Sequence, residues 1–460
     1  AFSIVVALFL MGLSAGAFVI ARRNLSTILR ETVLKVELFT AGSIVLSLVM
    51  ANRIPALLVN TGVRLHINSW AGLLTLQILS VALMILLPAF LMGMIMPLVL
   101  IWAGTKAADQ GVRLVGRSYA VNTIGAIAGA FVAGFVLIPK LSTRFTILFA
   151  AALCLTVAAA AYQPKVDAKA RDLQRALAAG LTLVLIVLLF FVAPRMNLGD
   201  LSVGAYDSLV RVLAKSRGAV EDETVPQRGP EIHQLLMYDE GPTSTVSVRK
   251  DWDITSMAIN GRTNASDSED MATQVMLGQM PLLLAPRLKN ALVVGFATGV
   301  TAGAILQSPI ESVECVELEP ATVNGSRFFE HVNLHPLNDP RLHLIIDDAR
   351  TYLRVNPTRY DIIVSEPSHP WVPGVANLFT REFFQLGRER LNDDGIFVQW
   401  LQIYQLSTDS LRSILATFHE TFPYVQVFRV QGALPGQRGE VRDGGAKAES
   451  EQDAEADRHD

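Results

Sequence analysis

The sequence predicts an α-helical membrane domain followed by an α/β domain with a doubly wound parallel sheet. Two observations lead to this prediction. Hydrophobic residues make up 51% of the 460 residues and charged residues only 18%, and the long uncharged runs lie before about residue 195. Such a composition is too apolar for an ordinary soluble protein. Beyond that point short apolar strands alternate with glycine turns and helices, which is the pattern of a parallel sheet.

Apolar runs in the first half are long enough to cross a bilayer, which takes roughly 20 residues. Six such runs lie near 2–21, 36–59, 70–102, 119–139, 142–162 and 176–194. The third contains Pro88 and Pro97, so we expect it to be tilted, kinked, or broken into a span and a re-entrant piece. We expect no acidic residue deep in any span, which argues against a proton-coupled or ion-coupled transporter.

Composition also excludes some classes of function. A net charge of −3 argues against a nucleic-acid binder, which would show a clustered basic excess. Cys154 and Cys315 are the only cysteines, too few for a disulfide framework or a metal cluster. We therefore expect no metal, and we expect both cysteines to be inert core residues.

The second half is expected to begin with a linker and a small β-hairpin region. Glycine and proline interrupt residues 195–235, which we interpret as the linker. Strands are predicted at 243–249 and 255–259, and the second ends at Asn260-Gly261, a strong signal for a tight turn. A polar loop at 262–270 and then a helix are expected next.

Strands and helices alternate from about residue 290 onward. Strands are predicted at 291–294, 313–319, 342–346, 361–364, 395–401 and 424–430. Gly295 and Gly299 follow the first strand, where glycine lets the backbone approach a nucleoside and a helix N-terminus lies behind. Glu317 comes about 20 residues later, where a carboxylate can bind the hydroxyls of a ribose. Asp347 and Asp348 end the third strand and can accept a hydrogen bond from the adenine amine.

The stretch from Tyr360 to Trp371 joins a buried strand to a polar loop braced by two prolines. Ligands of an open α/β sheet bind outside the carboxyl ends of the strands, so an acid at this place is suited to chemistry. Glu366 is that acid. The alternative is that Glu366 merely caps the next helix.

Taken together, these motifs resemble the nucleoside-binding fold of S-adenosylmethionine-dependent enzymes, and more narrowly spermidine synthase, the polyamine aminopropyltransferase, over residues 236–432. The apolar first half with Gly116-Arg-Ser-Tyr-Ala-Val-Asn-Thr-Ile-Gly125, together with Ser365-Glu-Pro-Ser-His-Pro-Trp371, resembles bacterial membrane-fused spermidine synthase-like proteins. Those proteins join a multi-span, transporter-like region to an aminopropyltransferase-like domain.

The resemblance implies an α-helical multi-span membrane domain followed by an α/β Rossmann-like domain of the class I S-adenosylmethionine-dependent methyltransferase type, with a small N-terminal β-hairpin region. We expect a membrane domain at 1–194, a linker at 195–235, a catalytic domain at 236–432 and a disordered tail at 433–460, whose composition is charged and poor in apolar residues. In the family a further strand completes the sheet, and no such strand is found here.

The resemblance also implies the cofactor side of a site. The family's glycine-rich turn falls on Gly295 to Val300, which includes Thr298 and Gly299. Its ribose-binding acid falls on Glu317, and its adenine-binding acid falls on Asp348, with Ala349 beside it. The implied co-substrate is decarboxylated S-adenosylmethionine, or S-adenosylmethionine itself, without a metal.

On the substrate side the resemblance is less complete. The family's catalytic loop lands on residues 366–370, so Glu366 inherits the role of general base and His369 replaces a polyamine-binding aspartate. Thr298 replaces the aspartate that binds the aminopropyl ammonium. A Tyr-His pair becomes Thr273-Gln274, and a glutamine of the substrate loop becomes Asn264. Cofactor binding is therefore better supported than putrescine binding.

A polyamine favours an acidic pocket lined with aromatic rings, where cation–π contacts assist binding. Candidates for such a pocket are Glu366, Glu269, Asp270, Trp371 and Tyr404. Trp371 can also be a packed lid residue, and the two acids before the helix can be a solvated helix start.

Three functions stay open. The first is a membrane-anchored aminopropyltransferase-like enzyme acting on a small amine, a polyamine in the family. The second is an S-adenosylmethionine-dependent methyltransferase, which the loss of the aspartate at Thr298 favours. The third is a membrane transporter or sensor whose second half binds polyamine or nucleoside without turnover. The lipid bilayer is an expected partner, nucleic acid is not, and a homodimer is an open state of assembly.

Loop charges give a test of orientation, because cytoplasmic loops carry the excess of Lys and Arg. The first, third and fifth loops hold four, three and four basic residues, and the second and fourth hold two each. Six crossings would then place the C-terminal half outside, whereas an adenosyl co-substrate is cytosolic. The conflict disappears if the third run crosses twice or if the bias is too shallow to decide. We expect a protein of the bacterial inner membrane with a cytoplasmic catalytic domain.

Overall fold

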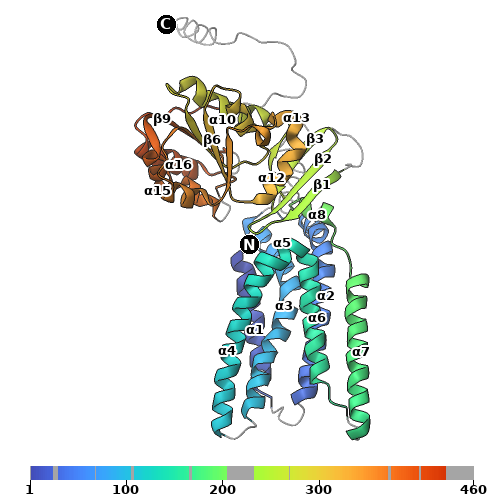
Figure 1. Ribbon diagram of the computed structural model, residues 1–460. Helices are drawn as coiled ribbons and strands as arrows, with labels where there is room; N and C mark the ends of the chain where they lie inside the picture. The colour runs from blue at the N-terminus through green and yellow to red at the C-terminus, as the bar shows by residue number, and fades with distance from the viewer. Residues whose placement is uncertain are drawn as a thin grey trace, which may run out of the picture.

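The computed structural model describes residues 2–23, 29–67, 69–104, 108–164, 168–204, 233–268, 270–370, 374–403 and 406–430. The chain forms a set of long helices and an α/β part at one end of them (Figure 1). The predicted tail at 433–460 and most of the predicted linker lie outside the described residues.

Six helices are long and apolar enough to cross a membrane, as predicted. They are α1 (Phe2–Ala21), α2 (Leu29–Arg64), α3 (Trp70–Gly104), α4 (Ala108–Val132), α6 (Thr143–Ala161) and α7 (Ala168–Val192). Helix α4 continues through a π-helical turn, Ala133–Leu137, into α5 (Ile138–Leu141). After α7 a short helix, α8 (Leu198–Ser202), leads toward the α/β part.

The third run forms one helix, because Pro88 and Pro97 both lie inside α3. The alternative of a span plus a re-entrant piece is therefore wrong. The chain reverses direction at each connection, so the α/β part lies at the end of the bundle where α1 begins and where α2 meets α3 (Figure 1). That end holds the second and fourth loops, which are poorer in basic residues. With six crossings, the loops richer in basic residues lie at the opposite end of the bundle from the α/β part. The loop charges therefore conflict with a cytoplasmic location of the α/β part.

One acidic side chain is buried near the start of α2. Glu37 of α2 is only 7% exposed, and its carboxylate forms a hydrogen bond with the Cys154 thiol in the interior of α6. Thr40 and Ser43 are buried along the same helix. Carboxylates in such apolar surroundings are rare and frequently line ion pathways, and Glu37 lies at the beginning of the predicted span 36–59.

The α/β part begins with an antiparallel sheet of four strands in the order β1-β2-β3-β4. The strands are β1 (His233–Glu240), β2 (Thr245–Asp251), β3 (Ile254–Ile259) and β4 (Arg262–Ser266). Only β2 and β3 were predicted. The turn at Asn260-Gly261 is confirmed, since both residues have positive φ, 51° and 76°. The predicted polar loop is wrong over 262–266, because backbone pairing with β3 makes this polar segment a strand.

The second sheet has five parallel strands in the order β7-β6-β5-β8-β9. They are β5 (Asn290–Val294), β6 (Ser312–Glu317), β7 (Leu342–Ile346), β8 (Tyr360–Ser365) and β9 (Leu391–Gln399). The chain first adds strands on one side of β5 and then returns to add β8 on the other. The predicted doubly wound sheet is confirmed, and the β5/β8 boundary is its switch point, where such sheets bind ligands.

Helices connect the strands of this sheet. They are α10 (Met271–Leu284), α11 (Val300–Leu306), α12 (Pro320–Ser326), α13 (Glu330–Asn333), α14 (Ala349–Val355), α15 (Arg381–Glu389) and α16 (Thr408–Thr421), with 3-10 turns at Arg327–Phe329, Pro336–Asn338 and Val375–Phe379. The strand predicted at 424–430 is wrong. These residues have no regular structure, and Tyr424 is 93% exposed. Alternation of apolar residues does not make a strand without a partner, and β9 is the last strand of the described sheet.

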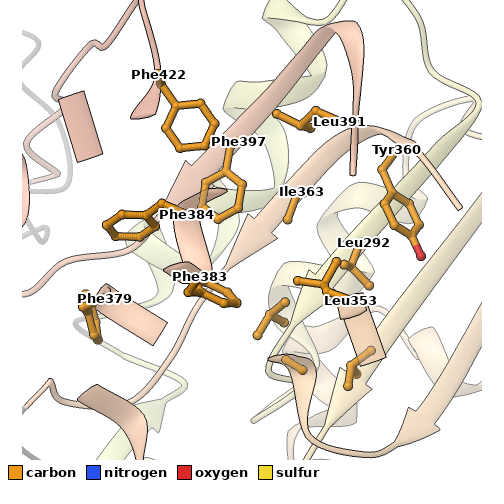
Figure 2. Packing of buried hydrophobic residues seen from close by; sticks show 13 residues of the cluster. Leu292, Leu353, Tyr360, Ile363, Phe379, Phe383, Phe384, Leu391, Phe397 and Phe422 are labelled. Carbon is orange, nitrogen blue, oxygen red and sulfur yellow. The ribbon is translucent and has the colours of Figure 1, made fainter. Parts of the chain in front are cut away.

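An aromatic cluster fills the space between β9 and the helices beside it (Figure 2). Phe384 of α15 is fully buried. Its ring lies 6.2 Å from that of Phe397 on β9 and 5.0 Å from that of Phe418 on α16. Burying a side chain of this size stabilises the fold by roughly 1.5–3 kcal/mol. The cluster therefore holds the edge strand that borders the site described below.

We predict that Phe384→Ala lowers the free energy of unfolding of the α/β part by about 3–5 kcal/mol, because it leaves a cavity in this cluster. Phe428→Ala is the matched control, since Phe428 is 56% exposed and its loss should cost under ~0.5 kcal/mol. Denaturant unfolding of the full chain in detergent micelles measures both. Equal losses for the two variants would show that the cluster does not support the fold.

Candidate active site

The carboxyl ends of β5, β6, β7 and β8 meet at one edge of the parallel sheet and carry most of the predicted site residues. The turn after β5 contains three residues in the left-handed region, Gly295, Ala297 and Gly299, with φ of 96°, 44° and 84°. A Cβ on Gly295 would lie 2.8 Å from the carbonyl oxygen of Glu366. Glycine is therefore required where this turn passes the end of β8.

Glu317, at the end of β6, contacts the backbone of the glycine turn. One carboxylate oxygen accepts a hydrogen bond from the Phe296 amide (2.8 Å), and the other accepts one from the Glu319 amide (2.9 Å). Burial raises the pKa of Glu317, while these amide hydrogen bonds lower it. The oxygen that faces Phe296 also accepts a longer hydrogen bond from the Ala297 amide at 3.5 Å, so the oxygen bonded to the Glu319 amide retains a lone pair for a ligand such as a ribose.

Asp348 follows β7 at the same edge, as predicted, and is exposed. Its carboxylate caps α14 by accepting hydrogen bonds from the amide and the hydroxyl of Thr351, both at 2.9 Å. Ala349 is buried at the start of that helix. The cap leaves one carboxylate oxygen of Asp348 able to accept a further hydrogen bond at the sheet edge.

Glu366 directly follows β8, and its amide donates to the carbonyl of Val294 at 2.9 Å. Its carboxylate lies 2.6 Å from the hydroxyl of Thr301, in the first turn of α11. Burial raises the pKa of Glu366 to about 7; the Thr301 hydrogen bond opposes this shift and the charge of Asp270 adds to it. The alternative that Glu366 caps the next helix is wrong, because Gly374 and Thr380 are the N-caps of the next 3-10 turn and of α15.

Asp270 precedes α10, but its carboxylate is directed back to β4. It accepts hydrogen bonds from the amide (2.8 Å) and the hydroxyl of Ser266 and from the side-chain amide of Gln274 (3.1 Å). Burial raises the pKa of Asp270, although the Ser266 hydrogen bonds lower it. Asp270 is thus a half-buried group beside Glu366, not a solvated helix start.

Thr298 and Gln274, both predicted site residues, contact each other and are almost fully buried. The Thr298 hydroxyl donates to the side-chain oxygen of Gln274, whose nitrogen donates to the Ser266 carbonyl (3.0 Å) and to Asp270. A neutral hydrogen-bonded pair, formed between the turn that follows β5 and α10, therefore lies beside Asp270.

The loop after β8 is joined to the antiparallel sheet. The side-chain nitrogen of Asn264 on β4 donates to the hydroxyl of Ser368 at 2.5 Å. His369 is 3% exposed, and its ring meets that of Trp400 edge to face with centroids 6.4 Å apart. Burial, assisted by the charge of Arg262, lowers the pKa of His369 to about 4. His369 is therefore neutral at pH 7 and does not replace an aspartate electrostatically.

A cavity of about 1370 Å³ opens beside these side chains. Its lining includes Asn264, Asp270 and His369, apolar residues of α10, β9 and α16, and the three arginines Arg249, Arg262 and Arg429. Trp371, Glu269 and Tyr404, which were predicted to line the substrate pocket, lie outside the described residues. Within the described ranges, no group of three His, Cys, Asp or Glu side chains could hold a metal ion.

Sequence reasoning missed Thr301 and Ser266, which hold the two acids Glu366 and Asp270. One signal for Thr301 exists: it is a hydroxyl residue in the first helical turn after the glycine turn, and that turn faces the neighbouring strand end in a parallel sheet. For Ser266 the signal was hidden, because the segment was taken to be a loop.

Comparisons with known proteins show what the α/β part is similar to. Residues 270–431 match the family model for the spermine/spermidine synthase domain. The polyamine aminopropyltransferase of Alkaliphilus oremlandii is 26% identical over 174 residues, which is 37% of this chain and 61% of that protein. The enzyme of that name from Erwinia tasmaniensis is 31% identical over 187 residues, 40% of this chain and 65% of the relative. The chain thus spans less than two thirds of these relatives.

Two solved structures are similar to this chain at lower identity. The crystal structure of spermidine synthase from Thermotoga maritima is 21% identical, with a TM-score of 0.38, and covers 42% of this chain and 65% of that chain. A spermidine synthase in complex with the transition-state analogue AdoDATO is 20% identical, also with a TM-score of 0.38, over 42% and 64%. Residues 270–431 are thus similar to the spermine/spermidine synthase domain, and six long apolar helices precede them.

Proposed function

We propose that the protein is a membrane-anchored aminopropyltransferase that transfers an aminopropyl group from decarboxylated S-adenosylmethionine to an amine, with Glu366 as general base. One observation supports this most directly. The Glu366 carboxylate lies at the carboxyl end of β8 beside the glycine turn, and its pKa is raised to about 7. A general base works best when its pKa is close to the operating pH.

The chemistry explains why such a group is needed. A neutral amine attacks the methylene carbon next to the sulfonium, so that a C–N bond forms as the C–S bond breaks. The bonding electrons go to sulfur and methylthioadenosine leaves. The amine reacts only after losing a proton, which Glu366 accepts. Holding both substrates in line supplies much of the remaining rate enhancement.

The co-substrate would be held by the glycine turn at Gly295 and Gly299, with Glu317 on the ribose and Asp348 on the adenine. The acceptor amine would approach from the cavity, past Asp270, Asn264 and His369. A small amine, a polyamine in the relatives named polyamine aminopropyltransferase, is the proposed acceptor. The predicted homodimer stays a prediction.

Two observations favour other functions. The neutral Thr298–Gln274 pair provides no carboxylate for an aminopropyl ammonium and so favours an S-adenosylmethionine-dependent methyltransferase. The buried Glu37 favours a transporter or sensor whose α/β part binds without turnover. Lack of affinity for both decarboxylated S-adenosylmethionine and S-adenosylmethionine would exclude both enzymes. With a panel of amines, methylthioadenosine as product indicates the aminopropyltransferase, and S-adenosylhomocysteine indicates the methyltransferase.

We predict that Glu366→Gln lowers kcat by about 10²-fold or more, because the amide cannot accept the proton from the amine. The affinity for the adenosyl co-substrate should change little. Glu311→Gln is the matched control, since Glu311 is an exposed residue of the same domain and its charge is remote from the strand ends. Steady-state kinetics with methylthioadenosine detection checks both variants. Turnover that survives Glu366→Gln unchanged would refute the base assignment.

The pH dependence follows from the raised pKa. Glu366 acts as a base only when ionised, so kcat should rise with pH through about 7 and at pH 6 reach roughly a tenth of its plateau. Thr301→Val removes a hydrogen bond that favours the ionised form, so the acidic limb should move to higher pH. A pH profile of each enzyme measures this shift. A limb that moves to lower pH, or does not move, would contradict the proposed contact.

The proposed orientation places the α/β part in the cytoplasm and the helices in the bacterial inner membrane, because the adenosyl co-substrate is cytosolic. The loop charges oppose this orientation, so it is a sharp test. Green fluorescent protein fused to the C-terminus should fluoresce in cells, and alkaline phosphatase fused there should be inactive. Fusions after residue 106, three crossings away, should give the opposite results. An active phosphatase at the C-terminus would contradict the use of a cytosolic co-substrate.

A further inference from the structure

The helices and the α/β part are joined by a hydrogen bond at the start of α6. Ser142 is the N-cap residue of this helix, but it has a φ of 87° and its side chain makes no capping hydrogen bond. The Glu240 carboxylate, at the end of β1, takes that place and accepts a hydrogen bond from the Thr143 amide at 2.6 Å. A carboxylate at a helix N-terminus is favoured by the free amides and by the helix dipole. The α/β part therefore caps a helix of the bundle.

The turn that follows Glu240 encloses a second carboxylate. Gly241 donates to the Ser244 carbonyl at 3.0 Å and closes the turn between β1 and β2. Inside it, Glu319 accepts hydrogen bonds from the Thr243 amide (3.0 Å), the Thr243 hydroxyl (2.7 Å) and the Ser244 amide (2.9 Å). A Cβ on Gly241 would lie 1.9 Å from a Glu319 oxygen. The turn therefore packs closely around the Glu319 carboxylate, and a side chain at position 241 would clash with it.

Glu319 is also bonded to the residue that faces the expected ribose. It is 3% exposed, and its amide donates to Glu317, whose other oxygen accepts from the Phe296 amide in the glycine turn. A continuous series of contacts therefore runs from Thr143 in the helical bundle through Glu240, the turn and Glu319 to Glu317.

A second contact keeps the antiparallel sheet on the bundle. The Gly204 amide, just after α8, donates to the Gly261 carbonyl in the β3–β4 turn at 2.6 Å. A Cβ on Gly261 would lie 3.0 Å from that amide nitrogen. Hydrogen bonds at Glu240 and at Gly261 thus both hold the antiparallel sheet in place. A displacement at the start of α6 therefore moves the turn after β1 and does not merely shift the whole sheet.

We propose that the apolar helices position the nucleoside site, with Glu240 and Glu319 as the positioning residues that transmit the placement of α6 to Glu317. This inference rests on the proposed nucleoside site and gives the helical part a role beyond anchoring. When the hydrogen bond between Glu240 and Thr143 is lost, the turn at 241–244 is free to move. The buried Glu319 carboxylate then reorients to keep its hydrogen bonds. The backbone amide of Glu319, which orients Glu317, moves with it.

The test uses the full chain in lipid nanodiscs with methylthioadenosine as the probe. Calorimetry should show roughly 2- to 5-fold weaker binding for Glu240→Gln, which weakens the interaction with the helix N-terminus. Glu319→Gln should bind roughly 10-fold more weakly, because it loses a charged acceptor for several donors. In turnover, KM for the adenosyl co-substrate should rise while kcat and the KM of the amine stay unchanged. Glu240→Asp should recover part of the lost affinity.

Asp239→Asn is the matched control, because Asp239 adjoins Glu240 on β1 but contacts Asn324 of α12 and not α6. It should bind the probe like the unsubstituted chain. Hydrogen exchange gives a second readout that needs no ligand: amides in 241–244 and in the peptide 290–300 should exchange faster in Glu240→Gln than in Asp239→Asn.

The outcomes separate this inference from the proposed function. If the unsubstituted chain binds methylthioadenosine and Glu240→Gln has equal affinity and equal exchange, the positioning role is wrong and the function stands. If the unsubstituted chain does not bind, the proposed function fails, and exchange in 290–300 alone decides whether α6 supports the glycine turn. Faster exchange confined to 241–244 would overturn the proposed connection.

Discussion

The close approach of the β5 and β8 ends is the constraint on which the site depends. The Glu366 amide reaches the Val294 carbonyl at 2.9 Å, and this is possible because Gly295 has no Cβ to meet the Glu366 carbonyl. The same approach carries the Glu366 side chain over the first turn of α11, where Thr301 meets it. A larger residue at 295 would separate the strand ends and with them the base and its hydrogen-bond donor.

Environment assigns different roles to the carboxylates at this edge. Glu317 accepts several backbone amide hydrogen bonds, which favour its ionised form and suit it to hold hydroxyl groups. Glu366 has one hydroxyl as its described partner, so burial dominates and raises its pKa to about 7. Burial raises the pKa of both acids, so their different roles rest on their partners: backbone amides orient the Glu317 carboxylate, whereas the described partner of the Glu366 carboxylate is the Thr301 hydroxyl.

The helical part is connected to the α/β part by direct contacts. Its six helices and the α/β part share real contacts, at Thr143 with Glu240 and at Gly204 with Gly261, so the two halves are connected through hydrogen bonds and not only through the chain. The unbroken α3 removes one explanation for the distribution of loop charges. The buried Glu37 lies near the buried polar residues Thr40 and Ser43 of the same helix, and buried carboxylates of this kind are costly and mark functional sites in membrane proteins.

The sequence by itself determined the class of fold, because apolar run length and the alternation of strands with glycine turns are local signals. The six helices, the parallel doubly wound sheet and the placement of Gly295, Glu317 and Glu366 at strand ends all follow from such signals, whereas the order of the strands came from the structure. The sequence did not determine β4, whose polar residues become a strand only through pairing with β3, or β1, whose first residues were assigned to the linker although they pair with β2. For the same reason an alternating segment at 424–430 was taken for a strand although it has no partner. The pKa of Glu366, the enclosure of Glu319 by a distant turn and the capping of α6 by Glu240 were decided only by the tertiary structure, because burial and hydrogen bonding between residues far apart in the chain produce them.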